Sequence, residues 1–260
     1  MKTHTNFPAA ITKQCCFFLG AILLCSCTHV YYSPNSSNVP LFEKKGEFRL
    51  SGNYCVGSTV SDEITGGEIQ AAYAAGDHLG ILLNTAFMGG REEDNTQGHS
   101  SGSGSIIEMG AGYFKPLKKS HVFETYAGFG FGNVKNNYLS GGNSRVNFTK
   151  FFLQPSIGYS KKYFHVGIAS KLSFVIMKVD LPNGHNLIEP YDMGDIAYIT
   201  EKPLSVLWEP SFFIRAGVKA VKAQFQFTPS VNLNNKQLAQ NGVLLSMGII
   251  IAIDPGHIGK

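Results

Sequence analysis

Two polar stretches of the sequence collect side chains that could position a water molecule for hydrolysis. These side chains are Glu92, Glu93, Asp94 and His99 in the first stretch, and His185, Glu189, Asp192 and Asp195 in the second. A carboxylate and a histidine can share the proton transfers of such a reaction. The spacing fits no hydrolase motif, however, and solvated loops contain the same residue types. We therefore predict no catalytic residue, and a hydrolase at the loop rim remains an alternative.

The histidine, cysteine and glycine patterns predict neither a metal site nor a cofactor. The eight histidines form no pair four residues apart on a helix, and no cysteine pair has zinc spacing. The run Gly102-Ser103-Gly104-Ser105 lacks the strand–turn–helix context of a nucleophile elbow. The glycines from Gly128 to Gly132 alternate along a strand pattern, so they do not form a phosphate-binding loop.

One cysteine is a candidate for covalent lipid attachment. Four of the five cysteines lie within the first 27 residues. Cys15 and Cys16 begin an apolar stretch that is too short to span a bilayer, and Cys25 and Cys27 follow it. The sequence Leu24-Cys25-Ser26-Cys27 looks like a lipobox, in which Cys27 is the acceptor because small Ser26 precedes it. We predict a lipoprotein signal peptide over 1–26 and lipidation at Cys27. An ordinary secretory signal is the alternative reading.

The composition narrows the class of protein. Charged residues make up 15% of the 260 residues, whereas about a quarter is usual in soluble domains. The net charge of +4 is small and no basic run occurs, which argues against a nucleic-acid partner. Glycine and aromatic residues are abundant, which favours strands and tight turns.

From residue 46 onward the dominant hydrophobic period is two, which is the period of a β-strand. Ten segments fit this pattern, near 47–58, 68–76, 79–89, 105–115, 121–134, 146–160, 163–176, 204–218, 221–230 and 243–253. Most have the roughly 9–11 residues that a tilted strand needs to cross a bilayer. Short turns alternate with long polar links, as in outer-membrane barrels. The predicted fold is therefore all-β: an antiparallel up-and-down transmembrane β-barrel of ten strands.

The two faces of each predicted strand differ in a way that favours a membrane barrel. One face carries large aliphatic and aromatic residues, such as Phe164, Ile168 and Phe225. The other carries mostly small and amide residues, with few charges. A soluble lipocalin-like barrel or a β-sandwich, the alternative reading, would place more lysine and glutamate on its solvent face. We therefore predict that the apolar face points outward, to lipid.

An outward apolar face directs a balanced set of charges into the lumen. The predicted inward charges are Glu47, Glu68, Glu108, Glu124 and Glu209, with Arg49, Lys150, Lys171, Arg215 and Lys222. Because an unpaired charge in a narrow lumen is costly, the set predicts a network of ion pairs across the barrel. Ten strands enclose much less space than a porin. A largely plugged lumen is the leading reading, and a narrow pore for small solutes is the alternative.

The remaining segments define the predicted domain organisation. Residues 27–45 contain Pro34, Pro40 and an Asn/Ser run, so we expect lipidated Cys27 and a periplasmic linker there. Residues 46–254 would form the barrel and 255–260 a C-terminal tail. An even strand count places both barrel ends on the periplasmic side. We therefore expect an outer-membrane protein that is anchored through Cys27 with a periplasmic N-terminus.

Two stretches carry a resemblance to a known family. Residues 31–45 (YYSPNSSNVPLFEKK), followed by Gly46-Glu47, and the segment 70–80 (QAAYAAGDHLG) resemble parts of an uncharacterised family of Gram-negative outer-membrane β-barrel lipoproteins. The likeness covers about a third of the chain. It implies the location and the fold but no activity.

These observations lead to a functional expectation. We predict a non-enzymatic outer-membrane lipoprotein with a structural or surface-binding role, whose partners are outer-membrane lipid and an extracellular ligand or protein. The 180–203 link is the candidate contact surface, because it combines Leu187, Tyr191 and Ile199 with acidic residues. A solvated loop rarely needs so many apolar groups, so we expect it to fold over the barrel mouth or to bind a partner.

Overall fold

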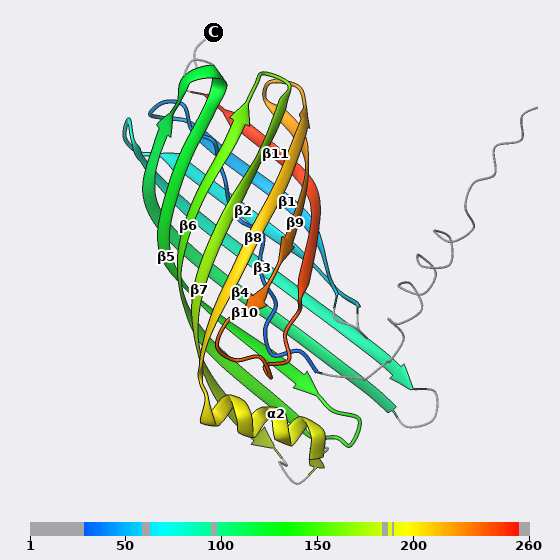
Figure 1. Ribbon diagram of the computed structural model, residues 1–260. Coiled ribbons are helices and arrows are strands. Elements are labelled where there is room, and N and C mark those ends of the chain that lie inside the picture. Colours follow the sequence, from blue (N-terminus) through cyan, green and yellow to red (C-terminus); the bar gives the residue numbers. More distant parts are fainter. Residues whose placement is uncertain (1–28, 59–62, 95–97, 184–186, 189, 255–260) are drawn as a thin grey trace, which may run out of the picture.

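A computed structural model describes residues 29–58, 63–94, 98–183, 187–188 and 190–254. The predicted signal peptide, Cys27, the predicted C-terminal tail, His185 and Glu189 therefore lie outside the described residues. The strands are β1 (Phe48–Ser58), β2 (Glu63–Ala74), β3 (Leu79–Asp94), β4 (Gly98–Pro116), β5 (His121–Asn137), β6 (Asn143–Ser160), β7 (Phe164–Asn183), β8 (Leu204–Gly217), β9 (Val221–Pro229), β10 (Val231–Asn232) and β11 (Val243–Ile253). Figure 1 shows them wrapped into a tall, tilted barrel.

The strands close into an antiparallel ten-stranded barrel, which confirms the predicted fold class. Neighbours along the chain pair from β1 to β8, and β11 pairs with both β1 and β9. Pairing of β8 with β9, from Phe212↔Phe227 to Gly217↔Lys222, completes the ring. The two-residue β10 follows β9 and pairs with the same neighbour, β8, at Val231↔Trp208, so we do not count it as an additional strand of the barrel.

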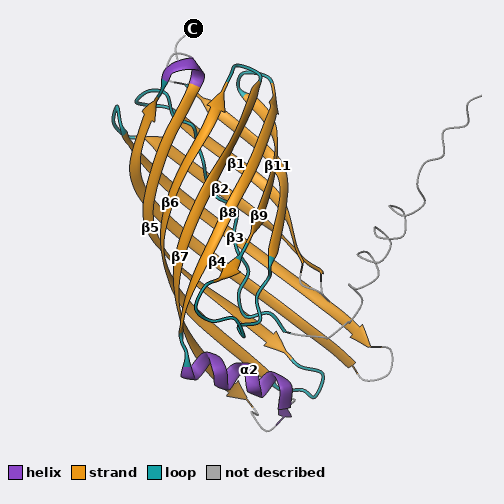
Figure 2. Cartoon of the chain, viewed as in Figure 1, coloured by secondary structure: helices purple, strands orange, loops and turns teal. Residues whose placement is uncertain are grey.

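The connections divide the barrel into a short-turn end and a long-loop end. Tight turns join β2 to β3, β4 to β5, β6 to β7 and β8 to β9, and β1 starts and β11 finishes at this same end. The other end carries the long connection from β7 to β8, with the helix α2 (Pro190–Glu201), and the long connection from β9 to β11, as Figure 2 shows. The links from β1 to β2 and from β3 to β4 at this end comprise only residues 59–62 and 95–97, so the predicted alternation of turn lengths holds only in part.

Part of one predicted loop is strand instead. Residues 89–94 of β3 pair with 98–103 of β4 in continuous register, whereas the sequence predicted a loop over 90–104. The sequence there is rich in glycine, serine and charged residues, so it lacks the alternation of apolar and polar residues that the other strands have. The backbone pairing of β3 and β4 continues without this alternation. The neighbouring strand β5 extends alongside, since it pairs with β4 as far as Asn137↔Ser101.

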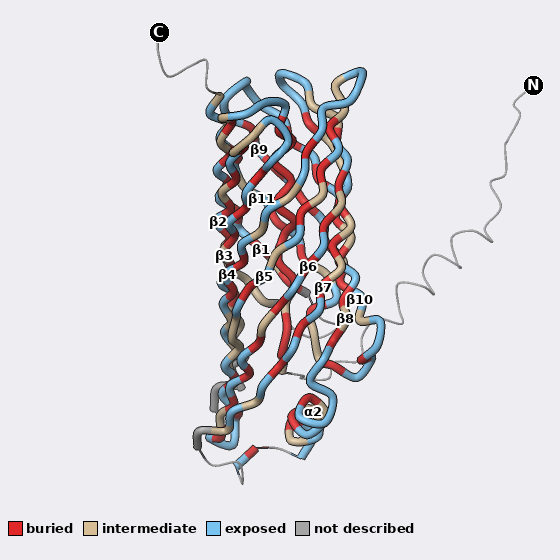
Figure 3. The backbone as a smooth tube through the Cα atoms, turned by 90° about the vertical axis from the view of Figure 1, so that its left-hand side faces the viewer, coloured by how far each residue is buried: buried red, intermediate tan, exposed pale blue. Residues whose placement is uncertain are grey.

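Alternate side chains along each strand point to opposite sides of the barrel wall. Ile168 and Met247 are 56% and 55% exposed on the outer face, whereas Lys171 and Ser246 on the same strands are buried inside. Figure 3 shows this alternation around the barrel. A closed barrel with a continuous outward apolar face has the surface that a bilayer requires. None of the helices in the described part of the chain is both long and apolar enough to cross a membrane.

The helix α2 folds over the long-loop end, which was one of the two outcomes expected for the 180–203 link. Pro190 begins the helix. Proline is favourable at this position because the first N–H groups of a helix have no carbonyl partner within the helix. Ile196 and Ile199 are buried in a cluster with Tyr138, Val175 and other side chains of the barrel mouth. Tyr191 and Leu187 remain exposed.

The segment expected to be a periplasmic linker lies mostly inside the barrel. Residues 30–42, here called the plug segment, run through the lumen from the long-loop end to the short-turn end (Figures 1 and 2). Every residue from Tyr31 to Phe42 except Ser33 is buried. The prolines and the Asn/Ser run do prevent a helix or a central strand, as predicted. They leave an irregular chain whose polar groups bond to the barrel wall.

Candidate functional site

All ten charged side chains predicted to face inward are buried in the structure. They are Glu47, Arg49, Glu68, Glu108, Glu124, Lys150, Lys171, Glu209, Arg215 and Lys222. They come from β1, β2, β4, β5, β6, β7, β8 and β9 and from the turn before β1. They do not form one network, however, and the structure divides them into a central cluster and several separate contacts.

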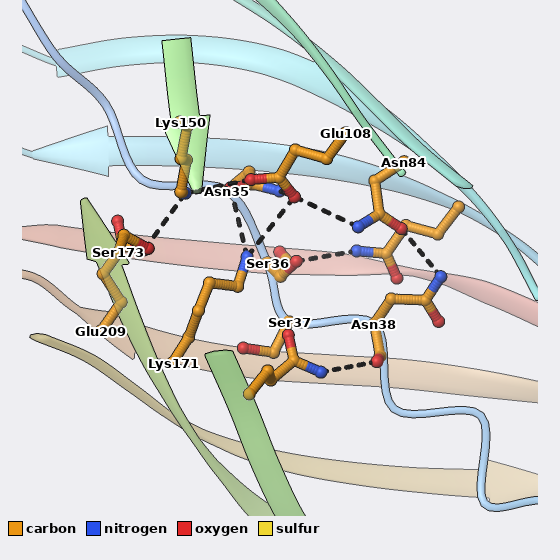
Figure 4. Close-up of polar contacts among 12 residues, drawn as sticks. Asn35, Ser36, Ser37, Asn38, Asn84, Glu108, Lys150, Lys171, Ser173 and Glu209 are labelled. Carbon is orange, nitrogen blue, oxygen red and sulfur yellow. Dashed lines mark hydrogen bonds and ion pairs between the residues drawn. The ribbon is translucent and has the colours of Figure 1, made fainter. Parts of the chain in front are cut away.

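The central cluster joins two lysines to two glutamates in the middle of the lumen (Figure 4). Lys150 Nζ lies 3.0 Å from Glu108 Oε1 and 3.2 Å from Glu209 Oε2. Lys171 Nζ lies 3.6 Å from Glu108 Oε2. All four side chains are fully shielded from solvent. Two positive and two negative charges balance, which is the condition under which buried charges are tolerated.

The plug segment supplies further hydrogen bonds to this cluster, beside those that Asn84 donates to Glu108 and Ser173 donates to Glu209 from the wall. Asn35 Nδ2 donates to Glu108 Oε2 at 2.7 Å, and Asn35 Oδ1 accepts from Lys150 at 3.1 Å and from Lys171 at 3.3 Å. The Tyr32 hydroxyl donates to Glu209 at 2.7 Å and accepts from Lys150 at 2.9 Å. One amide and one hydroxyl of the plug segment therefore contact every member of the cluster.

Three further inward charges bond to the backbone of the plug segment. Glu68 accepts from the Ser36 N–H at 2.8 Å, and Glu124 accepts from the Phe42 N–H at 2.9 Å. Arg215 donates to the Val39 carbonyl at 2.8 Å. An irregular buried chain needs such partners, because an unpaired backbone group inside a protein is costly.

The last three predicted charges lie toward the short-turn end. Arg49 bridges Glu47 at 3.0 Å and Asp254 at 3.1 Å, and Asp254 lies just after β11. Lys222 donates to the Lys219 carbonyl at 3.1 Å, and within the described ranges no carboxylate lies within ion-pair distance of it. These contacts fasten the two ends of the barrel sequence to each other.

Sequence reasoning missed the plug segment as a partner of these charges. The signal that could have found it is composition: Asn35, Ser36, Ser37 and Asn38 form a run of small donors and acceptors, with aromatic residues on both sides. In an exposed linker nothing requires this density. Inside the lumen the run matches the inward polar groups, with Ser36 bonded to Ser246 and Ser37 to Ser211.

Apolar side chains of the plug segment fill the lumen on either side of the polar run. Phe42 packs with Leu82, Phe114 and Tyr126 toward the short-turn end. Val39 and Leu41 pack with Phe213 and neighbouring wall residues. At the other end Tyr31 and Tyr32 join the cluster beneath α2. Leu82 and Tyr126 thus pack with the plug segment in one cluster and Phe213 in another.

A second polar cluster lies at the barrel mouth, where the plug segment leaves the lumen. His29 Nδ1 is 2.9 Å from Asp192 Oδ1 of α2, and His29 Nε2 is 2.7 Å from Ser100 Oγ of β4. Burial, and then the neighbouring carboxylate of Asp192, raise the pKa of Asp195 to about 6. Asp192 and Asp195 were named as rim candidates from the sequence, whereas His29 and Ser100 were not.

Most titratable side chains at these two clusters already have hydrogen-bond or ion-pair partners, which limits their use in catalysis or metal binding. In the described part of the chain no group of three or more His, Cys, Asp or Glu side chains could hold a metal ion. The lumen carboxylates accept hydrogen bonds from lysine, arginine, amide, hydroxyl or backbone donors. The side chains of Glu92, Glu93, Asp94 and His99 lie outside what the structure describes.

Comparison with known proteins adds little beyond architecture. No family model and no curated protein matches the chain. Among solved structures it is similar to the attachment invasion locus protein Ail of Yersinia pestis, bound to the heparin analogue sucrose octasulfate (10% identity, TM-score 0.38, covering 80% of this chain and 99% of that one). It is also similar to the translocator domain of the autotransporter NalP from Neisseria meningitidis (9% identity, TM-score 0.46, covering 80% and 86%). An outer membrane channel from Pseudomonas putida F1 is a third (8% identity, TM-score 0.41, covering 84% and 100%).

Proposed function

We propose that this protein is an outer-membrane β-barrel lipoprotein that closes its own lumen and acts through its long-loop end, in a structural or surface-binding role. The observation that carries the proposal is the plug segment, which occupies the lumen and contacts all four charges of the central cluster. The signal peptide, lipidation at Cys27 and membership in the resembling lipoprotein family are parts of the same proposal.

The contacts of the plug segment favour a closed barrel over a solute channel. Removing the segment would leave Glu68, Glu124 and Arg215 without the backbone partners that they now have. Each buried group left unpaired costs about 1–3 kcal/mol, and more if it is charged. The segment is also covalently continuous with β1 through residues 43–47. A permanent plug accounts for these contacts, whereas a channel would have to break them in order to conduct.

The proposed partners follow from the two exposed surfaces. Lipid would cover the outward apolar face of the strands. An extracellular ligand or protein would meet the long-loop end, where Tyr191 and Leu187 are 59% and 52% exposed beside the acidic residues of α2. Exposed aromatic and aliphatic groups at the rim of a barrel are suited to binding.

Planar-bilayer recording tests the closed lumen. The purified full-length protein should give no steady conductance steps. A variant in which residues 31–42 are replaced by a Gly/Ser sequence of equal length should conduct, because it keeps the chain length but loses the bonds and the bulk. Steady steps from the unaltered protein would contradict the proposal. Replacing exposed Leu139 by Ser is a matched control that should stay silent.

One observation favours a second candidate function, a hydrolase at the barrel mouth. Asp192, His29 and Ser100 are connected in the order of an acid, a base and a nucleophile, through the two different ring nitrogens of the histidine. The same contacts also fasten His29 to α2 and β4, which explains them without catalysis. Because both Ser100 and Asp192 are buried, we place this function second.

A fluorophosphonate probe separates the two candidates. A nucleophilic Ser100 would form a covalent adduct that Ser100→Ala abolishes, together with any hydrolysis of short-chain esters. The neighbouring variant Ser103→Ala, on the outer face of β4, should label like the unaltered protein. If the intact protein does not react, the contacts around His29 are structural.

A further inference from the structure

The plug segment enters and leaves the lumen at opposite ends of the barrel. At the long-loop end the Tyr31 N–H donates to Ala239 at 2.9 Å, and the Asn241 N–H donates to Tyr32 at 2.9 Å, both in the connection before β11. At the short-turn end the Gly46 N–H donates to Ala74 at 2.8 Å. The chain therefore crosses the whole height of the barrel before β1 begins.

This crossing changes the side of the membrane on which the N-terminal end lies. An even number of strands places Phe48 of β1 and Ile253 of β11 at the short-turn end. The plug segment adds one more pass, through the lumen instead of the lipid. His29 consequently lies at the long-loop end, next to Asp192 and Ser100. Long loops are the external side of an outer-membrane barrel.

The short covalent distance between His29 and the predicted lipid site limits the side of the membrane on which the lipid can lie. Only Thr28 separates Cys27 from His29 in the sequence. A fully extended chain spans at most about 3.6 Å per residue, so two such steps reach about 7 Å from His29 at most. A hydrocarbon core about 30 Å thick cannot be crossed by so short a stretch.

We propose that the protein is a threaded lipoprotein: its N-terminal segment passes through its own barrel, and the acyl chains on Cys27 sit in the outer leaflet, on the face of the long loops. This inference rests on the proposed function, because it requires an outer-membrane barrel and lipidation of Cys27. It replaces the periplasmic N-terminus that strand counting predicts.

The contacts at the mouth hold the exit point of the chain in place. His29 is fixed between α2 and β4, and its ring lies 4.4 Å from that of Tyr138. Tyr31 and Tyr32 are buried immediately below. Since these aromatic groups and the Asn35 contacts lie between His29 and the short-turn end, the chain cannot return to the periplasmic side without emptying the lumen. The wall must therefore close around the segment, or the segment must be inserted, during assembly.

Epitope insertion in the full-length protein tests the threading. One epitope is placed between Thr28 and His29, a second between Ser140 and Gly141 at the long-loop end, and a third between Lys118 and Lys119 at the short-turn end. Antibody binding is measured on intact cells and again after permeabilisation. Each variant is first checked for a folded barrel by the shift in gel mobility on heating.

The proposal predicts that the first two epitopes are detected on intact cells and the third only after permeabilisation. Detection of the Thr28–His29 epitope only after permeabilisation, while the Ser140–Gly141 epitope is exposed, would overturn the threading. If the epitopes at the two barrel ends behave alike, the barrel does not span the outer membrane and the proposed function fails. An unacylated Cys27 in mass spectrometry would remove the lipid anchor alone and leave the path of the chain to be decided by the epitopes.

Discussion

Lys150 is the residue on which the central cluster depends most. It is the only described side chain that contacts Glu108, Glu209 and the Tyr32 hydroxyl together. Its inward direction followed from the strand period, since Lys150 and Phe152 alternate with outward Phe151 and Leu153. Its two carboxylate partners did not follow, because the curvature and register of a barrel decide which inward groups meet.

Replacing Lys150 by Met should destabilise the protein strongly. The substitution keeps the bulk but leaves Glu108 and Glu209 with one fewer cation in a buried site. Removing one partner of a buried ion pair costs about 3–5 kcal/mol. The free energy of unfolding can be measured by urea titration in lipid vesicles. Lys135→Met, at an exposed position of β5, is the matched control and should change stability by less than about 0.5 kcal/mol. Equal effects at both positions would contradict the cluster.

Asp195 should make the attachment of α2 dependent on pH. Burial and Asp192 raise the pKa of Asp195 to about 6 from an ordinary value of 3.8, while His29 lowers it less. Between these values the folded form binds more protons than the unfolded form, so stability falls as pH rises from about 4 to about 6 and is then level. Hydrogen exchange of the α2 amides, corrected for intrinsic rates, should show protection declining across this window. The Asp195→Asn variant should lose that part of the decline, and an unchanged profile would refute the role of Asp195.

At the scale of elements, the strands were the most predictable part of the molecule. Their apolar and polar faces alternate because one side meets lipid and the other the lumen. The extension of β3 and β4 beyond residue 89 was not predictable, since its sequence lacks this alternation. The helix α2 was also missed, because Gly194 and a mixture of acids and apolar groups hide its period.

The outward face of β7 provides a direct test of its lipid contact. Ile168 is 56% exposed within the part of β7 whose outward apolar side chains extend from Phe164 to Ile176. Replacing it by Arg should lower the free energy of unfolding in vesicles by about 2–4 kcal/mol, as expected near the bilayer midplane. Val218→Arg, in the turn after β8, should cost about 0–1 kcal/mol because it lies near the interface. A cost at Ile168 no larger than at Val218 would mean that this face does not meet the hydrocarbon core.

The position of the plug segment inside the lumen could not be predicted from the sequence. Prolines, asparagines and serines between residues 33 and 40 are typical of an exposed linker. Nothing in the local pattern shows whether such a chain lies in water or inside a polar lumen. The inward charges explain why the lumen needs the segment. Glu68, Glu124 and Arg215 make no ion pair of less than 4 Å in the described structure. Neutral strand side chains serve some of them, as Gln224 does for Arg215, and the backbone of the plug segment supplies the other partners.

At the scale of the whole molecule, wall and plug form one folding unit. The inward polar groups of the wall are satisfied by the plug segment, and the polar backbone of the segment is satisfied by the wall. The outer face suits a bilayer. The filled lumen is the basis of the proposals that the barrel does not conduct and that the protein acts through its long-loop end.

A disulfide between the plug segment and the wall tests the central claim most directly. Ser37 Oγ lies 2.9 Å from Ser211 Oγ, and both side chains are buried in the lumen. In a Cys55→Ser background, the pair Ser37→Cys and Ser211→Cys should form a disulfide in protein extracted from membranes, seen by mass spectrometry as joined peptides. Ser37→Cys with Ser170→Cys, on the outer face of β7, should not. Absence of the first cross-link from a folded barrel, or equal formation of both, would contradict a plug segment inside the lumen.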